Sequence, residues 1–251
     1  MINPMELSGK TVLITGASDG IGKATALLLN QLGAKVIMVA RNEEKLQSVS
    51  EIIGGQNHGW YSYDLRNIDE IEDLVKKIVA DHGALDGFVH CAGISSLRPL
   101  KMTNFEYLHN MLLVNFYSFV ELTRCIAKKG NSNEGMSIIA MSSIAGMKGF
   151  KSQTAYSSSK AALEGAIRSM AKELCEKKIR INSIRAGFIK TRMLESFKEK
   201  TGKDENDPRF EIYGLGLGEP IDIANAIAYL LSDCSRIITG SSFVIDSGAT
   251  S

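Results

Sequence analysis

The sequence predicts an α/β fold, a doubly wound parallel sheet of seven strands with helices on both faces. Short apolar runs of strand length alternate with longer helical patterns along the chain. Such alternation is typical of parallel strands joined by right-handed helical crossovers. The first run, Thr11 to Thr15, is nearly continuously apolar and β-branched, as expected for a strand that is buried on both faces.

The expected elements follow from this alternation. The residues that recur at helical spacing after the first strand are Ile21, Ala24, Leu28 and Leu32. Asn42 and Thr154 are suited to cap the N-termini of later helices. We expect strands at 11–15, 35–39, 60–63, 87–91, 136–141, 179–184 and 242–245, and helices at about 42–53, 67–80, 104–129, 154–176 and 221–231.

Residues 190–218 interrupt the pattern, because periodicity is lost there and charge, glycine and proline accumulate. Long loops in compact domains are often lids, so we expect a substrate loop or lid at about 188–218. Its charged residues could equally form a solvated face. No repeat or linker divides the chain, and we expect one domain over residues 1–251.

A glycine turn follows the first strand, with Gly16, Gly20 and Gly22 in the spacing G-x-x-x-G-x-G. Gly16 permits a sharp exit from the strand, Gly20 lets the backbone approach a ligand, and Gly22 lets the next helix pack closely. Unpaired N–H groups at a helix N-terminus attract an anion. The turn therefore predicts a phosphate site, although a glycine-rich loop without a ligand is the alternative.

Composition excludes several classes of function. A hydrophobic content of 44%, a charged content of 23% and a net charge of +1 are those of an ordinary globular protein. They do not favour nucleic acid or an acidic membrane as a partner. The N-terminal residues contain no apolar signal segment, and no run reaches the roughly 18 apolar residues of a membrane span.

The four cysteines, Cys91, Cys125, Cys175 and Cys234, are far apart in the sequence. No cysteine or histidine spacing indicates a metal site, and scattered cysteines do not form a disulfide framework. We therefore expect no metal and a reducing, cytoplasmic location.

Tyr156 and Lys160 lie four residues apart on an expected helix, so their side chains share a face. Tyrosine has a pKa of about 10, and lowering it by about three units needs on the order of 4 kcal/mol. One ammonium at about 4 Å supplies that only where most solvent is excluded. Ser143, at the end of the fifth strand, could then polarise a carbonyl that Tyr156 protonates. A surface Tyr and Lys at helical spacing is the alternative.

In combination these motifs resemble the short-chain dehydrogenase/reductase family, in its shorter single-domain branch, and in particular members that reduce 3-oxoacyl groups on a carrier protein. The resemblance runs from about Lys10 to Gly248. The matching residues are Thr15, Gly16, Gly20, Gly22, Ala92, Gly93, Asn115, Ser143, Tyr156, Lys160 and Asn182.

The resemblance implies a Rossmann-like sheet that binds a nicotinamide cofactor, and an oxidoreductase that interconverts a ketone and a secondary alcohol. Tyr156 is then the acid/base, Ser143 orients the carbonyl, Lys160 holds the ribose and lowers the tyrosine pKa, and Asn115 anchors a water. The implied cofactor residues are Gly16, Ser18, Gly20, Ile21, Gly22, Arg41, Asp64, Leu65, Ala92, Gly93, Tyr156, Lys160, Ile189 and Thr191.

Two positions depart from the family pattern. His90-Cys91 stands where the family usually has two asparagines, so the polar tie to neighbouring strands is in doubt. We expect His90 to be structural rather than a catalytic base. Ala186-Gly187 replaces the usual Pro-Gly, so the following loop could be less rigid.

The end of the second strand predicts NADP(H) as the preferred cofactor, with NAD(H) as the alternative. An NAD site needs a carboxylate there to bind the ribose hydroxyls, and this chain has Arg41. A guanidinium can hold the 2′-phosphate. Asp19, in the glycine turn, could weaken phosphate binding or simply accept a loop N–H.

The substrate is left open: a 3-oxoacyl thioester, a deoxysugar ketone, a polyketide or a small xenobiotic ketone. A nucleotide-sensing or scaffolding protein without turnover is the alternative function. The resemblance implies a homotetramer, for which Met111, Leu112, Phe116, Phe119, Leu163, Ile167 and Met170 supply surplus apolar surface. It also implies an acyl carrier protein as partner, received by Lys128, Lys129 and Lys177, which could instead be solvated helix-terminal lysines.

Overall fold

The computed structural model describes residues 3–202 and 210–251. Within them, parallel strands form one seven-stranded sheet in the order β3-β2-β1-β4-β5-β6-β7. The order reverses between β1 and β4, which makes the fold doubly wound and Rossmann-like, as predicted. The strands are β1 (Thr11–Thr15), β2 (Lys35–Ala40), β3 (His58–Ser62), β4 (Leu85–His90), β5 (Ser132–Ser143), β6 (Arg180–Ala186) and β7 (Ser242–Ile245).

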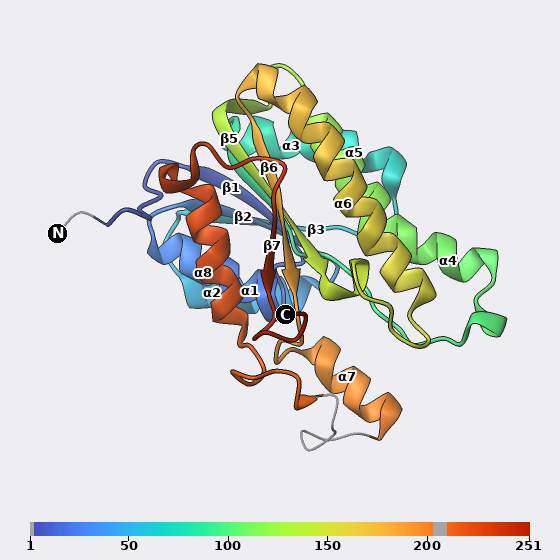
Figure 1. Cartoon of the computed structure of the whole chain (residues 1–251). Coiled ribbons are helices and arrows are strands. Elements are labelled where there is room, and N and C mark those ends of the chain that lie inside the picture. The colour runs from blue at the N-terminus through green and yellow to red at the C-terminus, as the bar shows by residue number, and fades with distance from the viewer. Residues whose placement is uncertain (1–2, 203–209) are drawn as a thin grey trace.

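Helices cover both faces of this sheet (Figure 1). One face carries α1 (Gly20–Gln31), α2 (Glu43–Ile53) and α8 (Pro220–Leu231), and the other carries α3 (Ile71–His82), α5 (Ser118–Ile126) and α6 (Thr154–Leu174), with α4 (Phe105–Leu112) beside α6. The helix α7 (Arg192–Thr201) lies apart from both layers, beyond the carboxyl ends of the strands. Short 3-10 turns occur at Ile68–Glu70, Leu100–Met102, Ile144–Gly146, Cys175–Lys177 and Asp233–Ser235, and a π-helical turn at Leu113–Tyr117.

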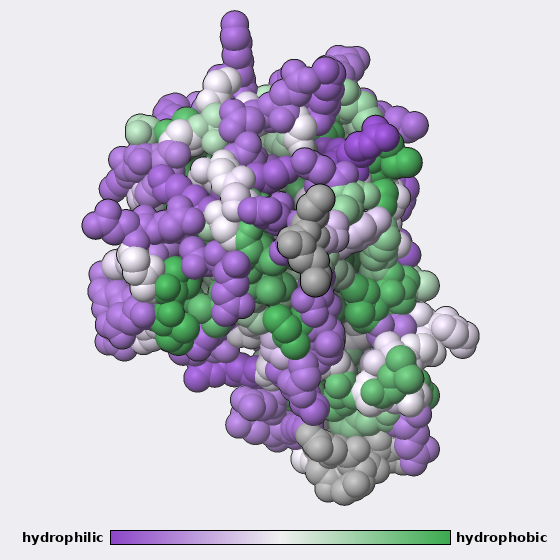
Figure 2. All heavy atoms as spheres, turned by 90° about the vertical axis from the view of Figure 1, so that its left-hand side faces the viewer, coloured by the Kyte–Doolittle hydropathy of each residue, from purple (hydrophilic) through white to green (hydrophobic). Residues whose placement is uncertain are grey.

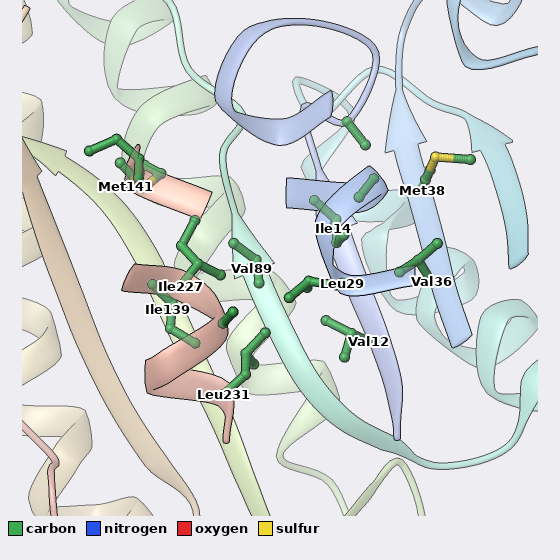
Figure 3. Close-up of a cluster of buried hydrophobic side chains, with 14 of the residues drawn as sticks. Val12, Ile14, Leu29, Val36, Met38, Val89, Ile139, Met141, Ile227 and Leu231 are labelled. Atoms are coloured by element: carbon green, nitrogen blue, oxygen red, sulfur yellow. The ribbon is translucent and has the colours of Figure 1, made fainter. Parts of the chain in front are cut away.

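The core has two layers because successive side chains of a strand point to opposite faces. Val12 and Ile14 pack in the layer under α1 and α8, whereas Leu13 packs in the layer under α5 and α6. Figure 3 shows the first layer, where Leu29 of α1 and Ile227 of α8 lie over the strands. Burial on both faces is why these strands are apolar without alternation.

Helix starts follow from capping side chains. The Asn42 side chain accepts a hydrogen bond from the Lys45 N–H at 2.7 Å, as predicted. For α6 the prediction is wrong: Thr154 is the first helical residue and Gln153 occupies the cap without a side-chain bond. The preceding turn, with Ser152 at a φ of 65°, already sets the entry into the helix.

Several element boundaries also differ from the prediction. The third strand begins two residues earlier, and β5 extends beyond its apolar centre at both ends. The expected helix at 104–129 is divided by the π-helical turn. In α1 the most buried side chains are Thr25, Ala26 and Leu29, and the predicted stripe at Ile21 and Leu28 is only partly buried.

The predicted lid segment is not a loop throughout, because it contains the helix α7. Its base is closed by a bridge between Ile189 and Gly218 and by an ion pair of 2.7 Å between Lys190 and Glu219. Residues 203–209 of the predicted lid lie outside the described residues.

The surface in Figure 2 is mostly polar, with apolar side chains in separate patches. Among the described residues, no helix is both long enough and apolar enough to span a membrane.

Candidate active site

Two cavities meet at the carboxyl ends of the strands, where the loops that follow β1 to β6 converge. The larger has a volume of about 880 Å³ and lies along the glycine turn and the ends of β2, β3 and β4. The smaller has a volume of about 150 Å³ and lies beside Ser143 and Tyr156. Ile21, Gly93 and Thr191 line both cavities, so the two are continuous.

The glycine turn is closely packed. A Cβ atom on Gly22 would lie 2.2 Å from the Gly16 carbonyl oxygen, and one on Gly16, whose φ is 70°, would lie 2.7 Å from the Ala92 nitrogen. Any side chain at these two positions would therefore move the strand end or the start of α1. The N-terminus of α1 borders the larger cavity at Gly20, where its backbone amides can bind an anion.

Asp19 caps this helix, and its carboxylate has partners within the protein. Its side chain accepts a hydrogen bond from the Gly20 N–H at 2.8 Å and forms an ion pair of 2.5 Å with Lys45. Of the two alternatives left open for Asp19, the structure shows the loop N–H contact. The Lys45 hydrogen bond is the main reason that the pKa of Asp19 is lowered.

Arg41 is exposed at the end of β2 and lines the larger cavity together with Lys45. Opposite them, Asp64 and Leu65 follow β3 and line the same cavity. Hydrogen bonds from Arg66 are the main cause of the lowered pKa of Asp64, and the charge of Arg41 contributes less. Sequence reasoning missed Lys45, because it lies one turn beyond the strand end at which Arg41 was sought.

Ser143 and Tyr156 border the smaller cavity. Burial raises the pKa of Tyr156, and the neighbouring Ser143 hydroxyl opposes this rise. The role of Lys160 in lowering this pKa, which the resemblance implies, stays a prediction, since Lys160 is not among the groups that shift it here. The Lys160 ammonium donates a hydrogen bond of 2.7 Å to the Met141 carbonyl oxygen, and it lies 5.8 Å from the centroid of the Tyr156 ring.

Lys160 is itself buried at 4% exposure. Burial lowers its pKa to about 8, against the opposing effects of Cys91 and Glu164. The lysine therefore loses its proton at a lower pH than an exposed lysine does.

Asn115 is fully buried in the π-helical turn and lines neither cavity. Its side-chain amide donates to the Ile94 carbonyl at 2.9 Å and to the Ser159 hydroxyl at 3.0 Å, and its oxygen accepts from the Ile94 N–H. A Cβ built on Gly93 would lie 3.4 Å from this oxygen and 3.6 Å from the Lys160 Nζ. Asn115 and Lys160 therefore lie together behind Gly93.

The other predicted cofactor residues also border the two cavities. Ser18, Gly20 and Ala92 line the larger cavity, and Ile189 lines the smaller. Thr191 occupies the N-cap position of α7, and its Cγ2 atom would lie 3.1 Å from a Cβ on Gly20. Asn182 lies elsewhere, since its side chain ties β6 to Ile238 and Ser241.

The two departures from the family pattern lie at the ends of β4 and β6. His90 is fully buried, and its Nδ1 lies 2.9 Å from the Thr15 hydroxyl, so the tie to β1 that was in doubt is present. Burial lowers the pKa of His90 to about 3. Gly187 donates a backbone hydrogen bond of 3.0 Å to the Ile245 carbonyl, which continues the pairing of β6 with β7 into the start of the loop.

These features fit a dinucleotide. The larger cavity falls within the roughly 300–1,000 Å³ typical of ligand sites. Its floor is a backbone cradle, the glycine turn at the N-terminus of α1, whose close packing requires glycine at positions 16 and 22. Arg41 and Lys45 also line the cavity, and Lys45 is paired there with Asp19. A doubly wound sheet with such a cradle beside a Ser–Tyr–Lys cluster defines an oxidoreductase that uses a nicotinamide cofactor.

Comparisons with known proteins agree with this class. Residues 16–250 match the family model described as enoyl-(acyl carrier protein) reductase. The 3-oxoacyl-(acyl-carrier-protein) reductase FabG of Thermotoga maritima is 35% identical over 97% of this chain and 99% of its own. The 3-oxoacyl-(acyl-carrier-protein) reductase of Mus musculus is 35% identical over 95% and 97%. The chain belongs to the short-chain dehydrogenase/reductase family.

Solved structures show the same relationship. A dehydrogenase/reductase from Sinorhizobium meliloti is 31% identical, with a TM-score of 0.90 over 99% of this chain and 98% of that one. A short-chain type dehydrogenase/reductase from Mycobacterium ulcerans is 30% identical, with a TM-score of 0.89 over 97% and 90%. The fold is thus shared along almost the whole chain.

Proposed function

We propose that the chain is an NADP(H)-dependent reductase of a 3-oxoacyl thioester, which it converts to the 3-hydroxyacyl thioester. The observation that carries this proposal is the continuity of the glycine-lined cavity with the one beside Ser143, Tyr156 and Lys160. The curated relatives that are named as 3-oxoacyl reductases support the choice of substrate.

In this proposal each residue of the cluster has a distinct task. Ser143 donates a hydrogen bond to the ketone oxygen and so orients it, while Tyr156 transfers its proton to the same oxygen. The raised pKa of Tyr156 keeps the phenol protonated at neutral pH, as an acid in the reducing direction requires. When bound, the nicotinamide supplies a hydride to the carbonyl carbon, and the products are the alcohol and the oxidised cofactor.

Lys160 and Asn115 support the proton transfer. Lys160 would hold the nicotinamide ribose and return a proton toward Tyr156, since its ammonium is buried beside the cluster. Asn115 would anchor a water behind Gly93, where it already fixes Ile94 and Ser159. Gly16, Ser18, Gly20, Ile21 and Gly22 would bind the pyrophosphate side of the cofactor. The remaining predicted cofactor residues are Arg41, Asp64, Leu65, Ala92, Gly93, Ile189 and Thr191.

We further propose that the chain is one cytoplasmic domain that assembles as a homotetramer and accepts an acyl carrier protein. Less apolar surface is left for a tetramer interface than expected, because Met111, Phe119, Leu163 and Ile167 are buried within the single chain. Sedimentation at micromolar concentration tests the assembly: a stable monomer would contradict it.

The test of the reaction uses purified protein, NADPH and two thioesters of equal chain length, 3-oxobutyryl- and crotonyl-N-acetylcysteamine. We expect NADPH oxidation with the ketone and none with the enoyl compound. Turnover of the enoyl compound alone would show that the chain reduces a carbon–carbon double bond and not a carbonyl group. Cofactor binding without turnover of either compound would favour a sensing or scaffolding role.

A further inference from the structure

The smaller cavity has an aromatic wall, which we define as Phe150, Phe188, Phe197 and Tyr213. Phe188 is its centre, because its ring centroid lies 5.3 Å from that of Phe197 and 5.6 Å from that of Tyr213. Ring pairs at such distances pack favourably and hold one another in place. These side chains come from the loop after β5, the loop after β6, α7 and the segment before α8.

This cavity has very little charge. Among the described residues that line it, Lys160 is the only charged side chain, and its ammonium already donates to Met141. The one side-chain amide on the same lining is that of Gln153. A carboxylate bound against the aromatic wall would lose its hydration without gaining a cationic partner, which is strongly unfavourable.

The volume sets an upper limit on the group that fits. An apolar cavity of about 150 Å³, the size of this one, is large enough for benzene. It lies well below the roughly 300 Å³ at which typical ligand pockets begin. The cavity can therefore enclose a group of about six heavy atoms beside the reacting carbonyl, and a longer chain would have to extend beyond the aromatic wall.

We propose that this cavity binds neutral ketones whose group at the aromatic wall is small and apolar, from methyl to a six-membered ring, and rejects carboxylates and long chains, with Phe188 as the specificity-determining residue. The proposal deepens the proposed function and rests on it for the identity of the reacting carbonyl. It selects short 3-oxoacyl thioesters among the substrates left open.

Binding tests the proposal independently of turnover. Ligand-observed NMR with NADP⁺-saturated protein would compare cyclohexanone, 4-oxocyclohexanecarboxylate and cyclododecanone. We expect cyclohexanone to bind at least about tenfold more tightly than either of the others, which corresponds to about 1.4 kcal/mol. Equal or tighter binding of the carboxylate or of the large ring would overturn the proposal, as would no binding of cyclohexanone.

Variants test which lining residues determine the size preference. Phe188→Ala should admit cyclododecanone and reduce the size preference roughly tenfold. Met193→Ala is a second variant with little risk to folding, since this lining residue is 43% exposed and should relax the same preference. Phe105→Ala, at an 81% exposed phenylalanine outside both cavities, is the control and should change nothing. An unchanged preference in both lining variants would overturn the assignment to the aromatic wall.

The same protein is scored for turnover of 3-oxobutyryl-N-acetylcysteamine with NADPH. Selective binding without turnover would contradict the proposed function and still support the proposed binding site. Turnover without selective binding would support the proposed function and remove the inference about the aromatic wall.

Discussion

The Nζ atom of Lys160 donates a hydrogen bond to the carbonyl oxygen of Met141 at 2.7 Å. This bond ties α6 to β5 two residues before Ser143. Because Tyr156 lies one turn earlier on the same helix, the bond also sets the position of the phenol relative to Ser143. Lys160 is thus a structural part of the cluster as well as its positive charge.

The pH dependence of reduction should follow Lys160. Burial lowers its pKa to about 8, so the ammonium is present below that pH and is lost above it. The pKa of Tyr156 is raised and keeps the phenol protonated over the same range. We expect kcat/KM for a 3-oxoacyl thioester to fall as the pH rises through about 8. A profile that stays flat to about pH 10, where free lysine titrates, would contradict this role.

Glu164 should stabilise the helix that carries Tyr156 and Lys160. It lies one turn beyond Lys160, is 3% exposed, and accepts hydrogen bonds from Ser183, Ser242 and Arg185. Its ion-pair partner Arg185 keeps 21% of its side chain exposed, so losing the charge of Glu164 should cost about 1–3 kcal/mol, as an unsatisfied polar group does. We expect Glu164→Gln to lower the free energy of unfolding by an amount of that order, while Glu173→Gln, at an exposed position of the same helix, leaves it unchanged. Urea unfolding measures both variants.

The contribution of Glu164 to the free energy of unfolding should depend on pH, because the same hydrogen bonds shift its pKa. Burial works to raise the pKa of Glu164, but the hydrogen bonds from Ser242, Arg185 and Ser183 lower it below 4.5. Its contribution is therefore present above pH 4.5 and is lost as the pH falls below that value. Wild type and Glu164→Gln should converge in stability on acidification. An unchanged gap between them at low pH would contradict the ionised state.

Arg41 should read the 2′-phosphate of NADPH. It lines the larger cavity at the end of β2, where an NAD site would have a carboxylate. A charge-assisted contact contributes about 1.5–3 kcal/mol, so Arg41→Ala should weaken NADPH binding roughly 10- to 100-fold and leave NADH binding nearly unchanged. Arg168→Ala, at an exposed arginine that lines neither cavity, is the control. An equal loss for both cofactors would show that Arg41 does not contact the phosphate.

In the proposed docking of an acyl carrier protein, two of the three lysines also have partners within the chain. Lys128 pairs with Glu72 at 2.7 Å, and Lys177 donates to the Ala127 carbonyl at 2.8 Å. We expect charge reversal at Lys129 and Lys177 to raise KM for a carrier-linked substrate and to leave the N-acetylcysteamine thioester unaffected. Unchanged kinetics on both substrates would exclude docking at these helix ends.

The sheet could be predicted from sequence because burial on both faces leaves short apolar runs that glycines and polar residues separate. The strand edges were less certain: β5 continues through Ser132 and Ser143, where polar side chains carry no apolar signal. Helix α7 was missed because its apolar residues, Met193, Leu194 and Phe197, stand among charged residues that obscure the helical period.

The proximity of Tyr156 and Lys160 in the proposed catalytic cluster could be predicted because they share one helix face, which is a local relationship. The aromatic wall could not, since Phe150, Phe188 and Tyr213 come from separate connections and meet only after folding. The contact of Lys45 with Asp19 was missed for the same reason, because it joins the starts of two helices 26 residues apart.

The most direct test of the account is kcat/KM of Tyr156→Phe with NADPH and 3-oxobutyryl-N-acetylcysteamine. The substitution removes only the phenol oxygen, so the unfolding temperature and NADPH affinity should match the wild type. We expect kcat/KM to fall by about 10²–10⁴-fold, the usual contribution of general acid–base catalysis. A variant that folds, binds NADPH and retains more than about a tenth of the wild-type value would contradict the assignment of Tyr156 as the proton donor.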